Sequence, residues 1–209
     1  MFLYRPVGLD ELRLIYESGL AAFPPRLPEQ PIFYPIFNFS YTEQIARDWN
    51  TKSPSRAGYV VRFEVDDTYI DRFEPHTVGS REHRELWVGA EELETFNSHI
   101  LPPIRVVSSY FAEDFKGFVP EKFMLQGKDA VVQFVTLTKA LNYSSFDFWC
   151  EVEANQTAVF LHYPFWKQQD FSADGVGVTE RDRVLAAIEA RWTQGISSWP
   201  LSEIYSFGS

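Results

Sequence analysis

Hydrophobic residues in the first half of the chain follow two patterns. Residues 2–5 and 59–65 form short apolar runs, which are typical of strands. From residue 90 to residue 100 the apolar side chains recur three and four positions apart, which is typical of a helix. The sequence predicts strands over residues 2–5, 32–34, 59–65 and 104–111, and helices over residues 10–17, 41–49 and 90–100.

The connecting segments are marked by proline and by polar residues. Residues 23–35 contain five prolines and predict an extended loop in which only an edge strand is tolerated. Residues 76–84 predict a polar loop, and Pro102-Pro103 are expected to break the chain. In the helix over residues 41–49, Ile45 and Trp49 are the predicted inward side chains.

The second half carries fewer clear signals. Residues 113–128 have the composition of a loop, so we place a boundary there, between a domain of residues 1–118 and an extension of residues 119–209. The apolar run 130–141 is long enough to favour a helix, and residues 179–192 begin with a capping signal and predict another. Residues 146–152 and 157–163 predict a β-hairpin. The expected fold class is α+β.

Composition limits the class of protein. The chain has 209 residues, of which 45% are hydrophobic and 17% aromatic, so a packed core is expected and disorder is not. The formal net charge is -10, and no run of Lys or Arg is long enough to follow a phosphate backbone. Nucleic acid is therefore an unlikely partner, although local arginines still permit binding of a dinucleotide.

The cysteine and histidine residues exclude further classes. Cys150 is the single cysteine, which excludes an intramolecular disulfide and fits a reducing compartment, and its apolar neighbours predict a core position. The four histidines lack the spacing of metal ligands, so no metal site is expected. We find no signal peptide and no apolar stretch of about 20 residues, so we expect a soluble cytoplasmic protein without a membrane partner.

Two charged residues stand inside apolar runs. Glu85 is followed at once by Leu86-Trp87-Val88, and Arg5 ends the first apolar run of the chain. A buried charge without a partner is costly, so such residues either find a partner or do chemistry. The alternatives are a turn glutamate that stays in water and an arginine that forms a salt bridge with an acidic neighbour.

Five short motifs follow one another over about residues 1–112: Leu3-Tyr4-Arg5, Pro31-Ile-Phe-Tyr34, Gly58-Tyr-Val-Val-Arg-Phe63, Glu85-Leu-Trp-Val88 and Ile104-Arg-Val-Val107. With the order of the elements that carry them, they resemble the mono-ADP-ribosyltransferase fold. The chain is also similar to small bacterial proteins labelled as ADP-ribosylation proteins, in which the opening Tyr-Arg-Pro-Val-Gly and the segment Glu-Leu-Trp-Val recur. The resemblance implies a split mixed or antiparallel β-sheet core with flanking helices, and NAD as substrate.

The resemblance also implies roles for individual residues. Glu85 matches the carboxylate that stabilises the oxocarbenium-like ribose formed when NAD loses nicotinamide. Arg5 matches the arginine that holds the dinucleotide, and its neighbour Tyr4 is grouped with it. Tyr34 is the candidate ring to stack on nicotinamide, with Phe33 as the second candidate.

Two departures from the family pattern leave the acceptor open. The position two residues before the glutamate, which often carries Glu or Gln and orients the acceptor, is His83 here, which we count as a catalytic candidate. Many members carry Ser-Thr-Ser on the second strand, whereas residues 34–40 have only a late serine. The alternatives to a toxin-like transferase with a protein acceptor are therefore an NAD glycohydrolase and a non-catalytic interaction or immunity-type module.

In the non-catalytic alternative, the aromatic residues between positions 143 and 166 would form a protein-facing surface, although a core is their commoner use. These residues are Tyr143, Phe146, Phe148, Trp149, Phe160, Tyr163, Phe165 and Trp166.

Overall fold

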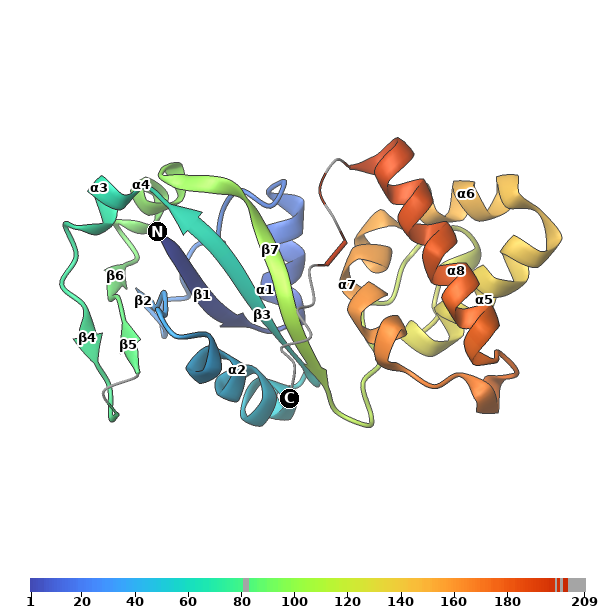
Figure 1. Ribbon diagram of the computed structural model, residues 1–209, viewed down its shortest axis with the longest axis horizontal. Helices are drawn as coiled ribbons and strands as arrows, with labels where there is room; N and C mark the ends of the chain where they lie inside the picture. Colours follow the sequence, from blue (N-terminus) through green and yellow to red (C-terminus); the bar gives the residue numbers. More distant parts are fainter. Residues whose placement is uncertain (81–82, 198, 200, 203–209) are drawn as a thin grey trace. The chain divides into compact units, whose positions relative to one another are not determined.

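The structure is a computed structural model that describes residues 1–80, 83–197, 199, 201 and 202 (Figure 1). The chain divides into two compact units, the first formed by Met1–Phe111 and the second by the described residues from Ala112 onward. The predicted boundary after residue 118 falls later, in the loop that follows the last strand. The first unit contains strands and helices, whereas the described part of the second unit contains helices alone, so the fold class is α+β.

Three antiparallel strands form the main sheet of the first unit (Figure 1). They are β1 (Phe2–Val7), β3 (Ala57–Val65) and β7 (Ile100–Phe111). β3 lies in the centre, where Phe63 pairs with Leu3 of β1 and Val60 pairs with Ser108 of β7. The strands predicted over residues 2–5, 59–65 and 104–111 are thus confirmed, each somewhat longer than its apolar run.

Pro102 and Pro103 lie inside β7 and do not break it, contrary to the prediction. β7 is an edge strand of the sheet, and the register between β3 and β7 shifts near this point, between Arg62 and Glu64. Proline cannot donate to a sheet ladder, so an edge strand or an irregular register is where it is tolerated.

The helix α2 (Phe39–Asp48) covers one face of the main sheet, where Ala46 forms a buried cluster with Val60 of β3 and Val107 of β7. Gly58 of β3 lies so close to this helix that a Cβ there would stand 2.0 Å from the carbonyl oxygen of Ala46. The close approach therefore requires glycine at this position.

The prediction that Trp49 points inward from α2 is wrong, and Ile45, predicted with it, is only partly buried. Thr42 and Ala46 are the buried residues of this helix, and Trp49 is its C-cap residue, 72% exposed. Residues four apart share a helix face, so Thr42 and Ala46 form the buried stripe and Ile45 lies beside it. Periodicity predicted the helix but selected the stripe beside the buried one.

The helix α1 (Leu9–Glu17) lies on the opposite face. Side chains alternate between the two faces of a strand, so Leu3, Arg5 and Val61 are directed away from the α2 side. On this face Arg5 meets Glu11 of α1. Aromatic rings from four segments fill the core here: Phe23, Phe33, Phe63 and Phe96.

Two small strand pairs extend the first unit. β2 (Ile32–Phe33) pairs with β6 (Val88–Gly89), and β4 (His76–Thr77) pairs with β5 (Arg84–Glu85). Residues 76–84, predicted as a polar loop, thus begin and end in a short hairpin. The remaining short helices of this unit are η1 (Asn50–Lys52), α3 (Asp67–Ile70) and α4 (Leu93–Ser98), the last lying within the helix predicted over residues 90–100.

The second unit is helical, and the predicted β-hairpin is wrong (Figure 1). Residues 146–152 lie in α6 (Ser145–Ala154), and residues 157–163 lie in α7 (Gln156–Gln168). α5 (Ala130–Tyr143) and α8 (Val178–Arg191) confirm the two helices predicted here. The shorter elements are η2 (Phe123–Leu125), η3 (Ser172–Asp174) and the π-helical turn η4 (Trp192–Ile196).

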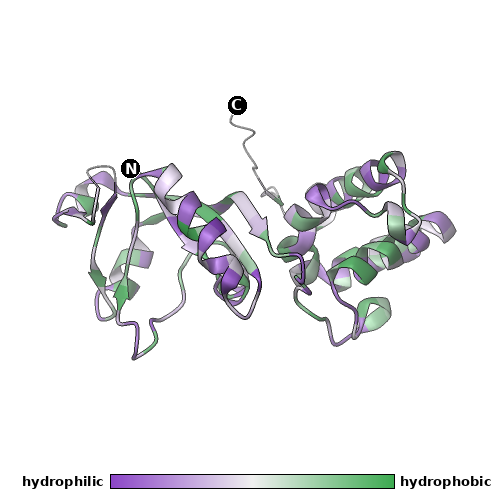
Figure 2. Ribbon diagram, turned by 90° about the horizontal axis from the view of Figure 1, so that it is seen from below, coloured by the Kyte–Doolittle hydropathy of each residue, from purple (hydrophilic) through white to green (hydrophobic). Residues whose placement is uncertain are grey.

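Burial explains why the hairpin prediction failed. Residues 158–166 of α7 are all buried, so this helix is apolar all round and lacks a polar stripe. Long green stretches of hydrophobic residues are visible in the helices of this unit in Figure 2.

Helix α6 begins at a polar cap, because the side chain of Ser144 accepts the backbone N–H of Asp147. Cys150 of α6 is exposed, so its predicted core position is wrong as well.

A buried polar network joins the helices of the second unit to the loop before α5. His162 is fully buried, and its Nε2 accepts the backbone N–H of Phe118 at 2.8 Å. This assigns the proton to Nδ1, which lies 2.9 Å from Oε1 of Gln133. Nε2 of Gln133 donates in turn to the carbonyls of Phe118 and Lys128. Complete burial lowers the pKa of His162 to about 3.

Candidate functional site

Glu85 lies at the edge of the first unit, in a small set of paired segments. The segment around Ile36 bridges β1 and β5, since Ile36 pairs with Tyr4 on one side and with Glu85 on the other. The backbone N–H of Leu86 donates to the carbonyl of Pro35 at 2.8 Å and fixes the next position. Directly paired residues share a sheet face, so Glu85 belongs to the α2 side.

The carboxylate of Glu85 is buried but not deep in the core. The residue is 8% exposed, and its Oε1 accepts the indole N–H of Trp87 at 2.8 Å. Trp87 follows two positions later along the chain and is itself 48% exposed. The alternative of a turn glutamate that stays in water is therefore wrong.

Aromatic rings pack on Trp87, the residue that donates to this carboxylate. The ring of Tyr34 meets Trp87 edge to face at 6.2 Å between centroids, and His76 stacks on Trp87 at 4.3 Å. Tyr34 is 37% exposed, so Trp87 and the ring that contacts it are both accessible to solvent. Half-exposed aromatic faces of this kind are suited to stacking on a planar ligand.

The candidate His83 lies on the same side of the first unit. Its ring stacks on Tyr41 of α2 at 3.9 Å with an angle of 9° between the planes. Burial raises the pKa of Tyr41, and the negative charge of Glu85 raises it further, so Tyr41 keeps its hydroxyl proton. A protonated phenol beside Glu85 is thus a feature of the site that sequence analysis did not find.

Arg5 is part of a second charged group. Its Nε donates to Oε1 of Glu11 at 2.7 Å, and Arg26 approaches the same oxygen at 3.7 Å. The side chains of Arg5 and Arg26 are only 8% and 9% exposed. Burial lowers the pKa of Arg26, and the charge of Arg5 lowers it further. Two guanidinium groups share one carboxylate, which leaves this group with a net positive charge.

Tyr34 connects the two charged groups. Nη1 of Arg5 lies 3.5 Å from the carbonyl oxygen of Tyr34, whose ring contacts Trp87, the donor to Glu85. The predicted residues Arg5, Tyr34 and Glu85 are therefore brought to one edge of the sheet. Arg5 and Glu85 belong to opposite faces, however, and Arg5 forms the salt bridge that was the alternative to ligand binding.

Of the other two predicted cofactor residues, Phe33 lies in the core and Tyr4 is partly buried against it. Phe33 is fully buried, with the guanidinium of Arg5 4.7 Å from its ring centroid, so its ring is not accessible for stacking on nicotinamide. Tyr4 packs edge to face on Phe39, next to the buried cluster under α2. Of the two predicted stacking residues, Tyr34 alone has an exposed ring.

Sequence analysis missed Trp87, Tyr41, Glu11 and Arg26. Trp87 had a signal, because alternation along a strand directs positions 85 and 87 to the same side. Arg26 had none, since it lies in the proline-rich segment 23–35, where no periodicity locates a side chain. Its contact with Glu11 depends on tertiary structure.

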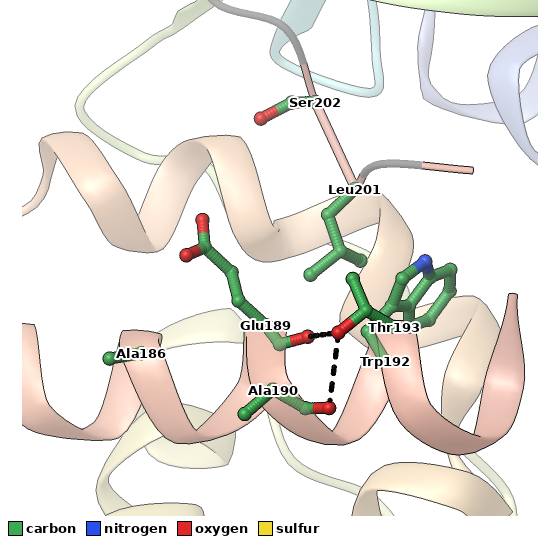
Figure 3. A pocket seen from close by; sticks show the side chains of 7 residues that line it. All are labelled: Ala186, Glu189, Ala190, Trp192, Thr193, Leu201 and Ser202. Carbon is green, nitrogen blue, oxygen red and sulfur yellow. Dashed lines mark hydrogen bonds between the residues drawn. The ribbon is translucent and has the colours of Figure 1, made fainter. Parts of the chain in front are cut away.

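The second unit contains a shallow pocket of about 360 Å³ beside α8 and η4 (Figure 3). Its wall includes Glu189, Thr193 and Ser202. The Thr193 hydroxyl already donates to backbone carbonyls, and the Glu189 carboxylate accepts the hydroxyl of Tyr163. The buried Ser202 hydroxyl has no hydrogen-bond partner among the described residues. No arginine among the described residues lines this pocket, whereas the first unit carries both the buried Glu85 and the Arg5–Arg26 pair, so the first unit remains the better candidate.

Two searches of the described residues were negative. No cluster of three or more His, Cys, Asp or Glu side chains in this part of the chain is arranged to hold a metal ion. No helix formed by the described residues has the length and apolar character needed to cross a membrane.

Comparisons of the chain with models of protein families, with curated proteins and with solved structures find no match.

Proposed function

We propose that the first unit binds NAD and cleaves the bond between nicotinamide and ribose, as an ADP-ribosyltransferase or an NAD glycohydrolase. The observation that carries the proposal is the arrangement around Glu85. A buried carboxylate is held by Trp87, whose ring contacts the exposed ring of Tyr34, and the Arg5–Arg26 pair lies at the same sheet edge on the opposite face. A dinucleotide requires these three chemistries together: a planar surface, a positive group and a carboxylate.

The carboxylate would act on the developing charge of the ribose. The bond from C1′ to the nicotinamide nitrogen breaks, and its electron pair leaves with nicotinamide. C1′ then carries positive charge, which a carboxylate at the 2′-hydroxyl stabilises. Water or an acceptor nucleophile attacks C1′ and releases a proton to solvent. The hydrogen bond from Trp87 fixes the orientation of Glu85 before the reaction.

The arginine pair supplies the anion-binding component. Arg5 and Arg26 hold one carboxylate between them, so a diphosphate would meet a group with an unbalanced positive charge. Guanidinium groups suit phosphate because they donate several hydrogen bonds in a fixed plane. Binding in this manner requires the diphosphate to share the guanidinium groups with Glu11.

One observation favours a second function, a non-catalytic interaction module that keeps the fold. Arg5 is already bonded to Glu11 through both Nε and Nη2, as expected if its role is to hold α1 against the sheet. In that case Tyr34 and Trp87 would contact a protein partner instead of a dinucleotide. Binding of NAD separates the two functions.

We would titrate the protein with NAD and with ADP-ribose, which lacks nicotinamide, by calorimetry. Stacking on Tyr34 predicts that Tyr34→Ala weakens NAD binding by about tenfold, since a stacked ring contributes about 1–3 kcal/mol. ADP-ribose binding should change much less. The matched control is Trp49→Ala, which removes another exposed ring of the same unit. Absence of NAD binding at concentrations on the order of millimolar would remove the proposal.

A further inference from the structure

The carboxylate of Glu11 lies between two guanidinium groups of the first unit. Nε and Nη2 of Arg5 donate to its two oxygens at 2.7 Å and 3.4 Å, and Nη1 of Arg26 lies 3.7 Å from the oxygen that Nε contacts. Because both guanidinium groups approach one oxygen, they converge on the position that Glu11 occupies. Two positive charges face one negative charge there, so one positive charge is left unbalanced.

Each arginine is also held by a contact that does not involve Glu11. The guanidinium of Arg5 lies 4.7 Å from the ring centroid of the buried Phe33. Arg26 donates from Nε to the backbone carbonyl of Gln30 at 3.2 Å and from Nη2 to the side-chain oxygen of the same residue at 3.4 Å. These contacts keep the two guanidinium groups in position when the Glu11 side chain turns away.

Glu11 is the member of this group that can leave it. Its side chain is 21% exposed, against 8% for Arg5 and 9% for Arg26. It stands in the first turn of α1, where the helix dipole and the free backbone N–H groups stabilise a carboxylate that points to water as well. Rotation about its side-chain torsions moves the carboxylate without moving the backbone.

We propose that Glu11 regulates the anion site by occupying it, and that the diphosphate of a bound dinucleotide displaces its carboxylate to solvent. The inference rests on the proposed function, because it takes the Arg5–Arg26 pair as the diphosphate site. In the free protein the carboxylate neutralises part of the buried positive charge, which is costly to leave unpaired.

Charge balance explains why the ligand displaces Glu11. The diphosphate of NAD carries two negative charges, one on each phosphate. A diphosphate that shares the pair with Glu11 brings three negative charges against two positive ones, and the like charges of ligand and carboxylate repel each other. When Glu11 turns to water, two ligand charges face two guanidinium groups, each able to donate several hydrogen bonds to phosphate.

Occupation by Glu11 lowers the apparent affinity of the site. A ligand that binds only the open state has its affinity reduced by the fraction of molecules in that state. Removing the charge of residue 11 raises this fraction, so the variant should bind a diphosphate more tightly than the wild type. A carboxylate whose role is to hold α1 against the sheet predicts the opposite, weaker binding and a lower urea midpoint in the same variant.

Calorimetric titration with inorganic pyrophosphate tests the proposal without any cleavage of NAD. Glu11→Gln keeps an acceptor oxygen for Arg5 and removes the competing charge, so it should bind pyrophosphate at least about tenfold more tightly than the wild type. Glu17→Gln is the matched control, because it removes the same charge from an exposed ion pair on the same helix and should leave the affinity unchanged. Equal or weaker binding by Glu11→Gln, an equal gain in Glu17→Gln, or no binding by any of the three proteins overturns the proposal.

A second measurement uses the wild type and does not depend on the folding of a variant. The resonance of the Glu11 carboxyl carbon is followed by NMR while pyrophosphate is added. It should move to the position of a solvated carboxylate with the midpoint of the calorimetric titration, whereas the Glu17 resonance should stay in place. A Glu11 carboxyl resonance that does not respond to bound pyrophosphate overturns the inference.

Failure of this inference is distinguishable from failure of the proposed function. If pyrophosphate displaces Glu11 but the protein releases no nicotinamide from NAD, the catalytic function is wrong and the regulation of the anion site stands. If nicotinamide is released and Glu11→Gln binds pyrophosphate no more tightly than the wild type, the inference is wrong and the catalytic function stands.

Discussion

Acid should destabilise the second unit through His162. The histidine is fully buried and neutral, with its pKa lowered to about 3 from the ordinary value of 6.5. The unfolded chain therefore binds a proton below about pH 6.5 that the folded chain does not bind until about pH 3. The contribution of the neutral His162 to the free energy of unfolding is therefore fully present above the unfolded pKa of 6.5. It is lost progressively as the pH falls from there towards about 3.

The expected loss follows from the difference between these two values. Each pH unit within the window costs about 1.4 kcal/mol. At about pH 5 the contribution amounts to a loss of about 2 kcal/mol relative to neutral pH. That is a substantial part of a total free energy of unfolding on the order of 5–15 kcal/mol.

Urea unfolding followed by circular dichroism, repeated between about pH 7.5 and about pH 5, measures this loss. His162→Gln removes the titrating ring and keeps an acceptor for the N–H of Phe118, so the variant should start less stable and lose less on acidification. NMR titration of the folded wild type should show His162 unprotonated throughout this range. A His162 that titrates near its ordinary pKa, or an equal acid loss in the variant, would refute the argument.

Three further changes test other parts of the structure. Gly58→Ala should lower the free energy of unfolding of the first unit by about 1–3 kcal/mol in urea unfolding, because the added Cβ meets a backbone carbonyl of α2. Asn97→Ala should cost about 1–3 kcal/mol by the same measurement, since its amide bonds both the N–H and the carbonyl of Phe23. Arg26→Gln should weaken calorimetric binding of NAD and of ADP-ribose equally, by about tenfold, because the loss concerns the shared diphosphate; Arg13→Gln on α1 is the control and should leave both unchanged.

Several elements of the first unit could be predicted because they bury one side only. A half-buried helix or strand shows its period in the sequence, as β1 and α1 do. The same logic failed for α7, whose residues 158–166 are all buried. An element that is apolar all round has no period, and its β-branched and aromatic residues then resemble a strand.

The candidate site was predicted in part, for a similar reason. Glu85 could be found because a carboxylate directly before an apolar run is unusual, and this feature is visible in the sequence alone. Its relation to Tyr34 and to Arg5 depends on the bridge through Ile36, which joins segments distant in sequence. The contact of Arg26 with Glu11 is also long-range. The local sequence pattern therefore indicated Glu85, whereas its spatial neighbours could be identified only from the three-dimensional structure.

The most direct test of the central proposal is the release of nicotinamide from NAD by the purified protein. Wild type and Glu85→Gln would be compared, with Glu94→Gln as an exposed carboxylate control on the same unit. We expect release by the wild type and by the control, and a loss of at least about a hundredfold in kcat for Glu85→Gln with NAD binding retained. Equal release by Glu85→Gln, or no release by a wild type that binds NAD, would contradict the assignment of this carboxylate.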